Sequence, residues 1–318
     1  MLTEVSIIIP IKDETDPHVG QCLKSLKMQK YDGLFEILVV KGGNRAQARN
    51  FGIRVAKGEI IAFIDSDCVA PQDWLSSLVS RLKTNKTLGG IGGVNFSAPD
   101  GRYLSKAIDF VFSSYLGSLG SASLHVPSKP KFVNALASIN SAFWRRTLEE
   151  IGGFDEEFEL CEDTNLSYKL RKAGYKLLFD PEIFVWHHRR DTLRGFAEQF
   201  FSYGRGRMQS ILTDRAYASK SVIVPFLGAL ILPLFAWLFP LVCITALSIY
   251  FVTIFIKGLQ GAIKAQKWHF ILLIPLLFMI EHLSYFFGLI YGVLKGGWKS
   301  KEGKCEVFYH TIVQKTVD

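Results

Sequence analysis

The sequence predicts an α/β domain followed by a membrane region. Two observations support this fold class. In the N-terminal part, short β-branched runs at residues 5–9, 36–40 and 59–64 alternate with stretches of helical apolar spacing at residues 19–28 and 46–56. Strands that alternate with helices form a parallel sheet covered on both faces, and ligands collect beyond the carboxyl ends of its strands. The last third of the chain instead contains long apolar runs.

The composition excludes several classes of protein. A chain of 318 residues is far longer than the roughly 40 residues below which a domain needs disulfides or metals to fold. With 49% hydrophobic and 13% aromatic residues, it is too apolar to be disordered. The net charge of +8 suits anionic phosphates or an anionic membrane face. Five scattered cysteines predict neither a zinc site nor a disulfide framework, and therefore favour a reducing, cytosolic side.

Residues 222–256 form a first membrane segment, because these 35 residues include no Asp, Glu, Lys, Arg or His. A straight helix of this length would measure ~50 Å, against ~30 Å of hydrocarbon. The segment must therefore tilt, overhang or fold back. Pro225, Pro233 and Pro240 are the expected breaking points, so a hairpin of two short spans turning near Pro240 competes with one long, kinked span.

A second apolar run, residues 268–294, has Glu281 and His282 as its central ionisable groups, which should face protein or water rather than lipid. Lysines before and after this run both predict a cytoplasmic location, so the sequence allows two or three spans of a multi-pass protein of the cell membrane with a cytoplasmic catalytic domain. The expected regions are a catalytic domain at 1–192, an interfacial amphipathic segment at 193–221, a transmembrane region at 222–294 and a basic tail at 295–318.

Two acidic pairs are the candidate sites of chemistry. Asp65 and Asp67 follow the third predicted strand at its carboxyl end, where two hard oxygen ligands suit Mg²⁺ or Mn²⁺ holding a diphosphate. Glu162 and Asp163 open a predicted helix and suit a general base. Turn chemistry for the first pair and the helix dipole for the second are the structural alternatives.

Basic and aromatic residues interleave between the predicted catalytic domain and the membrane region. His187 and His188 follow a short strand-like run, and Gln199, Arg205 and Arg207 lie in the next segment. This pattern is typical of an interfacial helix that binds lipid headgroups. The guanidinium groups equally suit the donor diphosphate or the acceptor. The glycine-rich residues 89–93 lack the Gly-Lys-Ser/Thr ending of a phosphate loop, and are interpreted as a tight turn into a strand.

Several motifs in one order resemble glycosyltransferase family 2. They are Ser6-Ile7-Ile8-Ile9-Pro10, Ala48-Arg49-Asn50, Asp65-Ser66-Asp67, Gly152-Gly153-Phe154-Asp155, Glu162-Asp163 and Val185-Trp186-His187. The resemblance covers about residues 4 to 210. It implies a GT-A fold, a Rossmann-like mixed sheet that binds a nucleotide-sugar donor and a divalent metal, with inversion at the anomeric carbon.

The resemblance also implies roles for single residues. The nucleotide-sugar site would be lined by Pro10, Lys12, Asp13, Glu14, Arg49, Asp65 and Asp67. Asp67 would hold the metal, with Asp65 beside it toward the ribose or sugar. Asp163, next to Glu162, would be the base. His187 matches a position that approaches the metal or the donor phosphates, and His188 is an equal candidate by sequence.

Two departures from the family pattern narrow the prediction. Lys41 stands where relatives often carry an aspartate that recognises the base, so a uracil nucleotide is not implied. Residues 199–203 depart from the Gln-x-x-Arg-Trp element of processive synthases, so a processive synthase is not expected.

The sequence therefore predicts an inverting glycosyltransferase that moves a sugar to a hydroxyl of a lipid-linked saccharide at the membrane. Its partners would be the nucleotide-sugar donor, a polyprenyl-linked or other lipid-linked acceptor and membrane lipid, with no nucleic acid. Two alternatives remain open. One is an enzyme that joins a sugar directly to polyprenyl phosphate, whose anionic oxygen needs no base. The other is a catalytically silent membrane adaptor.

Overall fold

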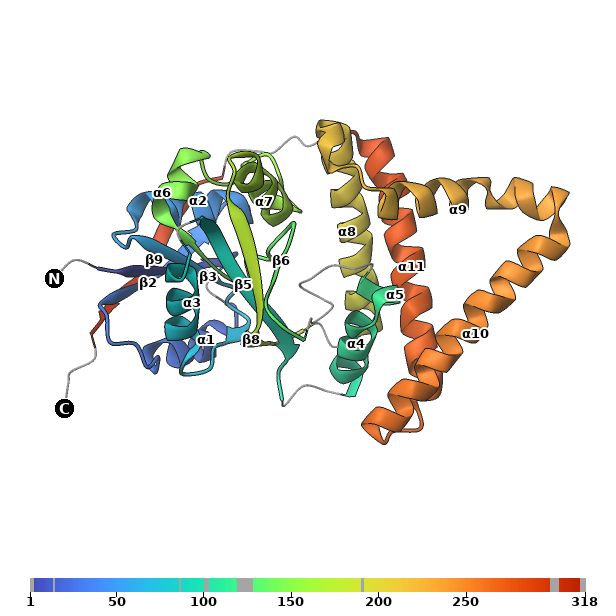
Figure 1. The fold of residues 1–318 in the computed structure, drawn as a ribbon, viewed down its shortest axis with the longest axis horizontal. Helices are drawn as coiled ribbons and strands as arrows, with labels where there is room; N and C mark the ends of the chain where they lie inside the picture. The colour runs from blue at the N-terminus through green and yellow to red at the C-terminus, as the bar shows by residue number, and fades with distance from the viewer. Residues whose placement is uncertain are drawn as a thin grey trace. The chain divides into compact units, whose positions relative to one another are not determined.

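The computed structural model describes residues 3–13, 15–85, 87–99, 103–118, 128–189, 192–297 and 303–314. The chain divides into two compact units (Figure 1). The sheet unit comprises residues 1–100, 121–189 and 299–318, and the helical unit comprises residues 101–120 and 190–298.

The sheet unit is built on one mixed sheet. Its strands are β1 (Val5–Ile11), β2 (Phe35–Gly42), β3 (Ile60–Ile64), β4 (Cys68–Val69), β5 (Leu88–Ser97), β6 (Lys131–Phe132), β7 (Asn140–Trp144), β8 (Lys176–His187) and β9 (Cys305–Val313). They pair in the order β4-β8-β5-β7-β3-β1-β2-β9, and β6 pairs with β8. β1 runs parallel to β2 and β3, whereas β7 and β9 run antiparallel to their neighbours. The three strands predicted from β-branched runs are thus present and parallel.

Helices cover both faces of this sheet. They are α1 (Val19–Lys27), α2 (Arg45–Val55), α3 (Trp74–Lys83), α6 (Arg145–Glu150) and α7 (Glu162–Lys172). α1 and α3 cover one face, where Leu78 and Ile7 belong to one apolar cluster. α2, α6 and α7 cover the other, where Leu166 and Ile8 belong to a second cluster. Successive residues of a strand point to opposite faces, so a strand buried on both sides reads as a continuous apolar run.

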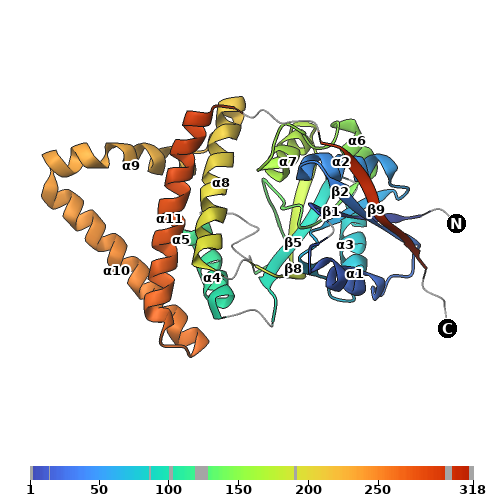
Figure 2. The ribbon, with the colours of Figure 1, turned by 180° about the vertical axis from the view of Figure 1, so that it is seen from behind.

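Strand β9, at the edge of the sheet, lies within the segment interpreted from the sequence as a basic tail. It pairs with β2 in antiparallel register, with Leu38 opposite His310 (Figure 2). His310 Nε2 lies 2.8 Å from Glu36 Oε2, and the Glu36 side chain is fully buried. Ser6 Oγ and the Lys57 backbone N–H also donate to this carboxylate, each at 2.6 Å. The C-terminal strand therefore supplies a partner for a buried acid.

The glycine-rich residues 89–93 lie inside β5, so their interpretation as a turn was wrong. A Cβ at Gly90 would stand 2.3 Å from the Phe143 ring, and one at Gly93 would stand 1.9 Å from the Ile183 carbonyl oxygen. Glycine is needed here because neighbouring strands and side chains approach the backbone closely, which is a usual reason for glycine within a strand.

The helical unit contains α4 (Tyr103–Ser113), α5 (Tyr115–Ser118), α8 (Leu193–Thr213), a 3₁₀ turn at Arg215–Tyr217, α9 (Lys220–Leu238), α10 (Pro240–Ala265) and α11 (Phe270–Lys295). The uncharged run breaks at Phe239, directly before Pro240, so the break expected at Pro240 is present, while the number of spans stays a prediction. Pro225 and Pro233 lie inside α9 and do not end it, so the expectation of a break at these two residues was wrong. A proline within a helix forfeits one hydrogen bond, and kinking can accommodate it.

Helices α8 and α11 pack at backbone distance. A Cβ at Gly204 would meet the Tyr285 carbonyl oxygen at 2.1 Å, and one at Gly288 would meet that of Phe201 at 2.1 Å. Small residues allow such an approach, as in membrane helix pairs. Glu281, also on α11, is only 3% exposed, so it faces protein as the sequence predicted.

Two helices, α10 and α11, are long and apolar enough to span a membrane by length and composition. Each has 26 residues and an 18-residue window with a mean hydropathy of 2.0, of which only 17% and 28% is buried. Large apolar side chains are exposed along α9 and α10; Trp237 and Leu241, for example, are each 78% exposed. Exposed apolar surface of this extent indicates contact with lipid or protein.

Candidate active site

The candidate active site lies at the carboxyl ends of β1 and β3, where Pro10 and Ile11 are the last residues of β1 and Asp65 follows β3 directly. Lys12 and Asp13 continue from β1 and are exposed. Thr15 donates hydrogen bonds to Asp13 from its hydroxyl and its backbone N–H, and these hold the pKa of the Asp13 carboxyl below its usual value. Glu14, also predicted to line the nucleotide site, lies outside the described residues.

Arg49 joins the two acidic motifs. Its Nη2 donates to Asp65 Oδ1 at 2.9 Å and its Nη1 to Glu162 Oε1 at 2.6 Å. The guanidinium is only 2% exposed and lies 5.6 Å from the centre of the Phe154 ring. Charge-assisted bonds to a planar guanidinium are strong and directional. The buried guanidinium of Arg49 therefore holds together two acidic motifs that are 97 positions apart. From the sequence, Arg49 was instead predicted to line the nucleotide site.

Helix α2 also holds the Gly152–Phe154 loop that precedes the second acidic motif. Asn50 Nδ2 donates to the Phe154 carbonyl oxygen at 2.9 Å, and the Phe154 N–H donates back to Asn50 Oδ1 at 2.8 Å. Gly153 has a φ of 65°, and a Cβ there would stand 2.5 Å from Asn50 Oδ1. Arg49 and Asn50 are neighbours in sequence, so this one turn of α2 positions both the loop and Glu162.

Glu162 and Asp163 occupy the first turn of α7. Glu162 is buried, while Asp163 is half-buried, and Asp163 Oδ1 accepts a hydrogen bond from the Thr164 N–H at 2.7 Å. Carboxylates at this position are stabilised by the helix dipole. Cys161, just before them, has a φ of 62°, which is uncommon for a residue other than glycine and often marks a functional turn.

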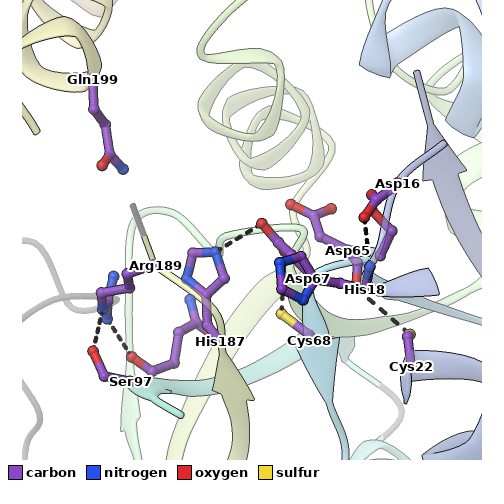
Figure 3. A network of polar contacts seen from close by, with 12 residues as sticks. Asp16, His18, Cys22, Asp65, Asp67, Cys68, Ser97, His187, Arg189 and Gln199 are labelled. Atoms are coloured by element: carbon purple, nitrogen blue, oxygen red, sulfur yellow. Dashed lines mark hydrogen bonds and ion pairs between the residues drawn. The ribbon is translucent and has the colours of Figure 1, made fainter. Parts of the chain in front are cut away.

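Asp67, Cys68 and His187 form a group of side chains that could hold a metal ion, with one ligand atom of each within 4.8 Å of the others (Figure 3). His187 Nε2 lies 3.2 Å from Asp67 Oδ2. This contact arises because β4 pairs with the end of β8, which sets Cys68 opposite His187. Asp65 is not part of the group, since its carboxylate faces Arg49.

The chemistry of the donor set fits a hard cation on Asp67 and His187. Burial opposes ionisation of Asp67, but the hydrogen bond and charge of His187 together with Arg45 hold the pKa of Asp67 below its usual value. Burial and the charges of Asp67 and Asp65 raise the pKa of the Cys68 thiol well above its usual value. His187 Nδ1 is buried without a hydrogen-bond partner among the described residues. Oxygen and nitrogen donors suit Mn²⁺ or Mg²⁺ better than a thiol does.

Asp16 and His18, for which the sequence predicted no role, adjoin this group together with Ser66 of the Asp65-Ser66-Asp67 motif. Ser66 donates its hydroxyl to Asp16, and the His18 ring stacks on the His188 ring with centroids 4.5 Å apart. The backbone N–H of His188 donates to the Asp67 carbonyl oxygen at 2.9 Å, so His188 lies beside the acidic turn. The sequence signal for a role of Asp16 and His18 was weak, because polar residues directly before a helix ordinarily act as helix caps.

The remaining predicted residues, Gln199, Arg205 and Arg207, lie on α8 in the helical unit. Gln199 Nε2 donates to the Tyr203 hydroxyl at 2.8 Å on the same helix. Their contact with a diphosphate or an acceptor stays a prediction.

Comparison with known proteins supports the fold and places the chain in a family. A model of the glycosyl transferase family group 2 matches residues 60–291. Glycosyltransferase AglE of Haloferax volcanii is 27% identical over 241 residues, covering 66% of this chain and 75% of AglE. Poly-beta-1,6-N-acetyl-D-glucosamine synthase of Staphylococcus epidermidis is 24% identical over 207 residues, covering 65% of this chain and 48% of the synthase. The chain therefore spans only about half the length of that synthase.

Among solved structures, the mannosyltransferase PcManGT of Pyrobaculum calidifontis, in complex with GDP-Man and Mn²⁺, superposes with a TM-score of 0.57. The two sequences are 16% identical, and the match covers 88% of each chain. This likeness confirms the predicted fold. Since the family model matches well over half of the residues, the chain belongs to glycosyltransferase family 2 and transfers a sugar from a nucleotide-sugar donor.

Proposed function

We propose that this enzyme is an inverting glycosyltransferase that moves a sugar from a nucleotide-diphosphate sugar to a hydroxyl of a lipid-linked saccharide at a membrane. The observation that carries the proposal is the Arg49 bridge between Asp65 and Glu162. It joins the end of β3 to the start of α7, which supports a shared site for the acidic turn and Asp163, the neighbour of Glu162. Proton removal and donor binding can then occur together.

Asp163 is the proposed base. It is half-buried in the first turn of α7, so its carboxylate can reach a substrate hydroxyl while the turn is held by its neighbour Glu162. Glu162 is itself engaged by Arg49, and its proposed role is to fix this turn. Asp163 accepts the proton of the acceptor hydroxyl as that oxygen attacks the anomeric carbon, the bond from that carbon to the diphosphate breaks, and the configuration inverts.

Asp67 and His187 are the proposed holders of a divalent cation, and Asp65 is the proposed contact for the ribose or sugar. A divalent cation bound there would neutralise the charge that develops on the leaving diphosphate. Pro10, Lys12 and Asp13 would line the nucleotide from the end of β1. The lysine offers the diphosphate a second positive charge.

A lipid-borne acceptor is supported by the helical unit. Helices α10 and α11 are long and apolar enough to enter a membrane, and the net charge of the chain is +8. A catalytic domain attached to the bilayer meets a lipid-borne acceptor at a high effective concentration. The proposed location is the cell membrane, with the catalytic domain on the cytoplasmic side.

The test is transfer by the purified full-length chain, with UDP-, GDP- and dTDP-sugars as donors. Asp163→Asn should lower turnover about 10²- to 10⁴-fold, the usual contribution of a positioned base, while donor affinity changes little. Glu157→Gln, an exposed carboxylate in the preceding loop, serves as the matched control and should stay near wild type.

Two acceptors separate the proposal from its alternatives. Transfer to a lipid-linked saccharide, with none to bare polyprenyl phosphate, supports it. Transfer to bare polyprenyl phosphate that survives Asp163→Asn would favour direct glycosylation of the phosphate instead. Absence of metal-dependent transfer or hydrolysis with every donor would favour a silent membrane adaptor.

A further inference from the structure

We propose that Asp16 is a positioning residue that couples the nucleotide loop after β1 to the metal-binding turn after β3, so that the divalent cation and the nucleotide bind cooperatively. The inference rests on the proposed function, because it assigns the cation to Asp67 and the nucleotide to the β1 loop. It concerns the link between the two sites. The proposed function assigns no role to Asp16 or Ser66.

Asp16 binds both sides of this link. Its Oδ1 accepts the backbone N–H of His18 at 2.9 Å, within its own loop, and its Oδ2 accepts the hydroxyl of Ser66, in the acidic turn. Asp16 is half-buried and Ser66 is 9% exposed, so the hydroxyl bond is partly shielded from water. Hydrogen bonds to a carboxylate are about twice as strong as those between neutral groups.

Two further contacts connect the same segment to the other residues of the turn. The His18 ring stacks on His188 at 4.5 Å, with an angle of 18° between the planes, and the His188 N–H donates to the Asp67 carbonyl oxygen at 2.9 Å. Cys22 Sγ lies 3.7 Å from the Asp65 carbonyl oxygen. Each residue of the acidic turn therefore contacts the segment from Asp16 to Cys22, either directly or through His188.

Through these contacts, the loop after β1 and the acidic turn after β3 should move and become ordered together. Lys12 and Asp13 lie only a few residues before Asp16, while Asp67 follows Ser66 directly. A cation that orders Asp67 thereby also orders the loop, and a nucleotide diphosphate then loses less conformational freedom when it binds. The coupling is reciprocal, so a bound nucleotide must raise cation affinity by the same factor.

A merely structural role for the Asp16–Ser66 bond makes a different prediction. Loss of that bond would then lower the melting temperature and leave the cooperativity between cation and nucleotide unchanged. The informative quantity is therefore the coupling factor, which is the Kd of Mn²⁺ without nucleotide divided by its Kd with saturating nucleotide.

The experiment measures this factor by calorimetry on the full-length protein in detergent, with GDP, UDP and dTDP as separate probes. Ser66→Ala, Asp16→Ala and the double variant form a cycle, and Ser80→Ala is the matched control, because Ser80 is exposed and bonds only within its own helix. Wild type and Ser80→Ala should show the same factor. Each single variant should lower it about 5- to 10-fold, within the usual range of coupling between sites, and the double variant should lower it no further.

A coupling factor that survives in both single variants, whatever their melting temperatures, would overturn the inference while leaving the proposed function intact. Additive losses in the double variant would also overturn it, because the two residues would then act separately. If wild type binds none of the three nucleotides in the presence of Mn²⁺, the proposed function fails and the inference fails with it.

Discussion

Replacing Arg49 by methionine tests whether the Arg49 bridge holds the active site together. Methionine keeps most of the side-chain length and removes the charge, so the effect reports the two ion pairs more than the packing. The guanidinium is 2% exposed, and its partners Glu162 and Asp65 are 8% and 21% exposed. Glu162 would therefore remain as a buried carboxylate without its cation, whereas Asp65 retains some access to water.

The magnitude follows from this burial. Removing one partner of a buried ion pair costs about 3–5 kcal/mol, chiefly because the remaining charge is left uncompensated. For a unit of this size each kcal/mol lowers the melting temperature by roughly 2–4 °C, so Arg49→Met should lower it by roughly 6–20 °C. Adding Glu162→Gln to the variant should restore part of this loss, since a neutral amide is cheaper to bury than a carboxylate.

The assay is thermal unfolding of the full-length protein in detergent, followed by circular dichroism, together with donor turnover. Arg54→Met is the matched control, because Arg54 lies on the same helix, is 63% exposed and is 3.7 Å from Glu156. An exposed pair contributes at most about 1 kcal/mol, so the control should melt within a few degrees of wild type. If Arg49→Met melts as the control does, or if Glu162→Gln makes it worse, the bridge does not organise the site.

Three further outcomes are expected. Gly153→Ala should destabilise the sheet unit by about 1–3 kcal/mol, because φ at Gly153 is 65° and the new Cβ meets Asn50 Oδ1. The control Gly20→Ala, in open space on α1, should be neutral or stabilising. Equal melting temperatures of the two variants would refute the backbone strain at Gly153. His310→Ala should lower the free energy of unfolding by about 1–2 kcal/mol, because Glu36 Oε2 loses its partner. The loss is smaller than for a fully buried hydrogen bond, since the His310 side chain is 36% exposed. An unchanged urea unfolding curve would contradict this. Chelation of divalent cations should abolish transfer, and added Mn²⁺ should restore it; turnover that survives chelation would remove the metal from the mechanism.

The sequence by itself determined the elements whose signal is local. The runs at 5–9, 36–40 and 59–64 indicated β1, β2 and β3, because β-branched residues at strand spacing bury both faces of a central sheet. The absence of charge in 222–256 indicated apolar helices, since lipid excludes charged side chains. The order of the motifs indicated the family.

Only the tertiary structure decided how distant residues pair. The Arg49 bond to Glu162 spans 113 positions, and the β2–β9 pairing brings His310 to Glu36 across 274. No periodicity reports such contacts, because they depend on which strands become neighbours in the sheet. The same holds for residues 89–93, which resemble a turn in isolation but form part of a strand in which Phe143 and Ile183 leave no room for a side chain at Gly90 or Gly93. The sequence thus indicated the candidate site residues, while the topology of the sheet decided which of them lie together.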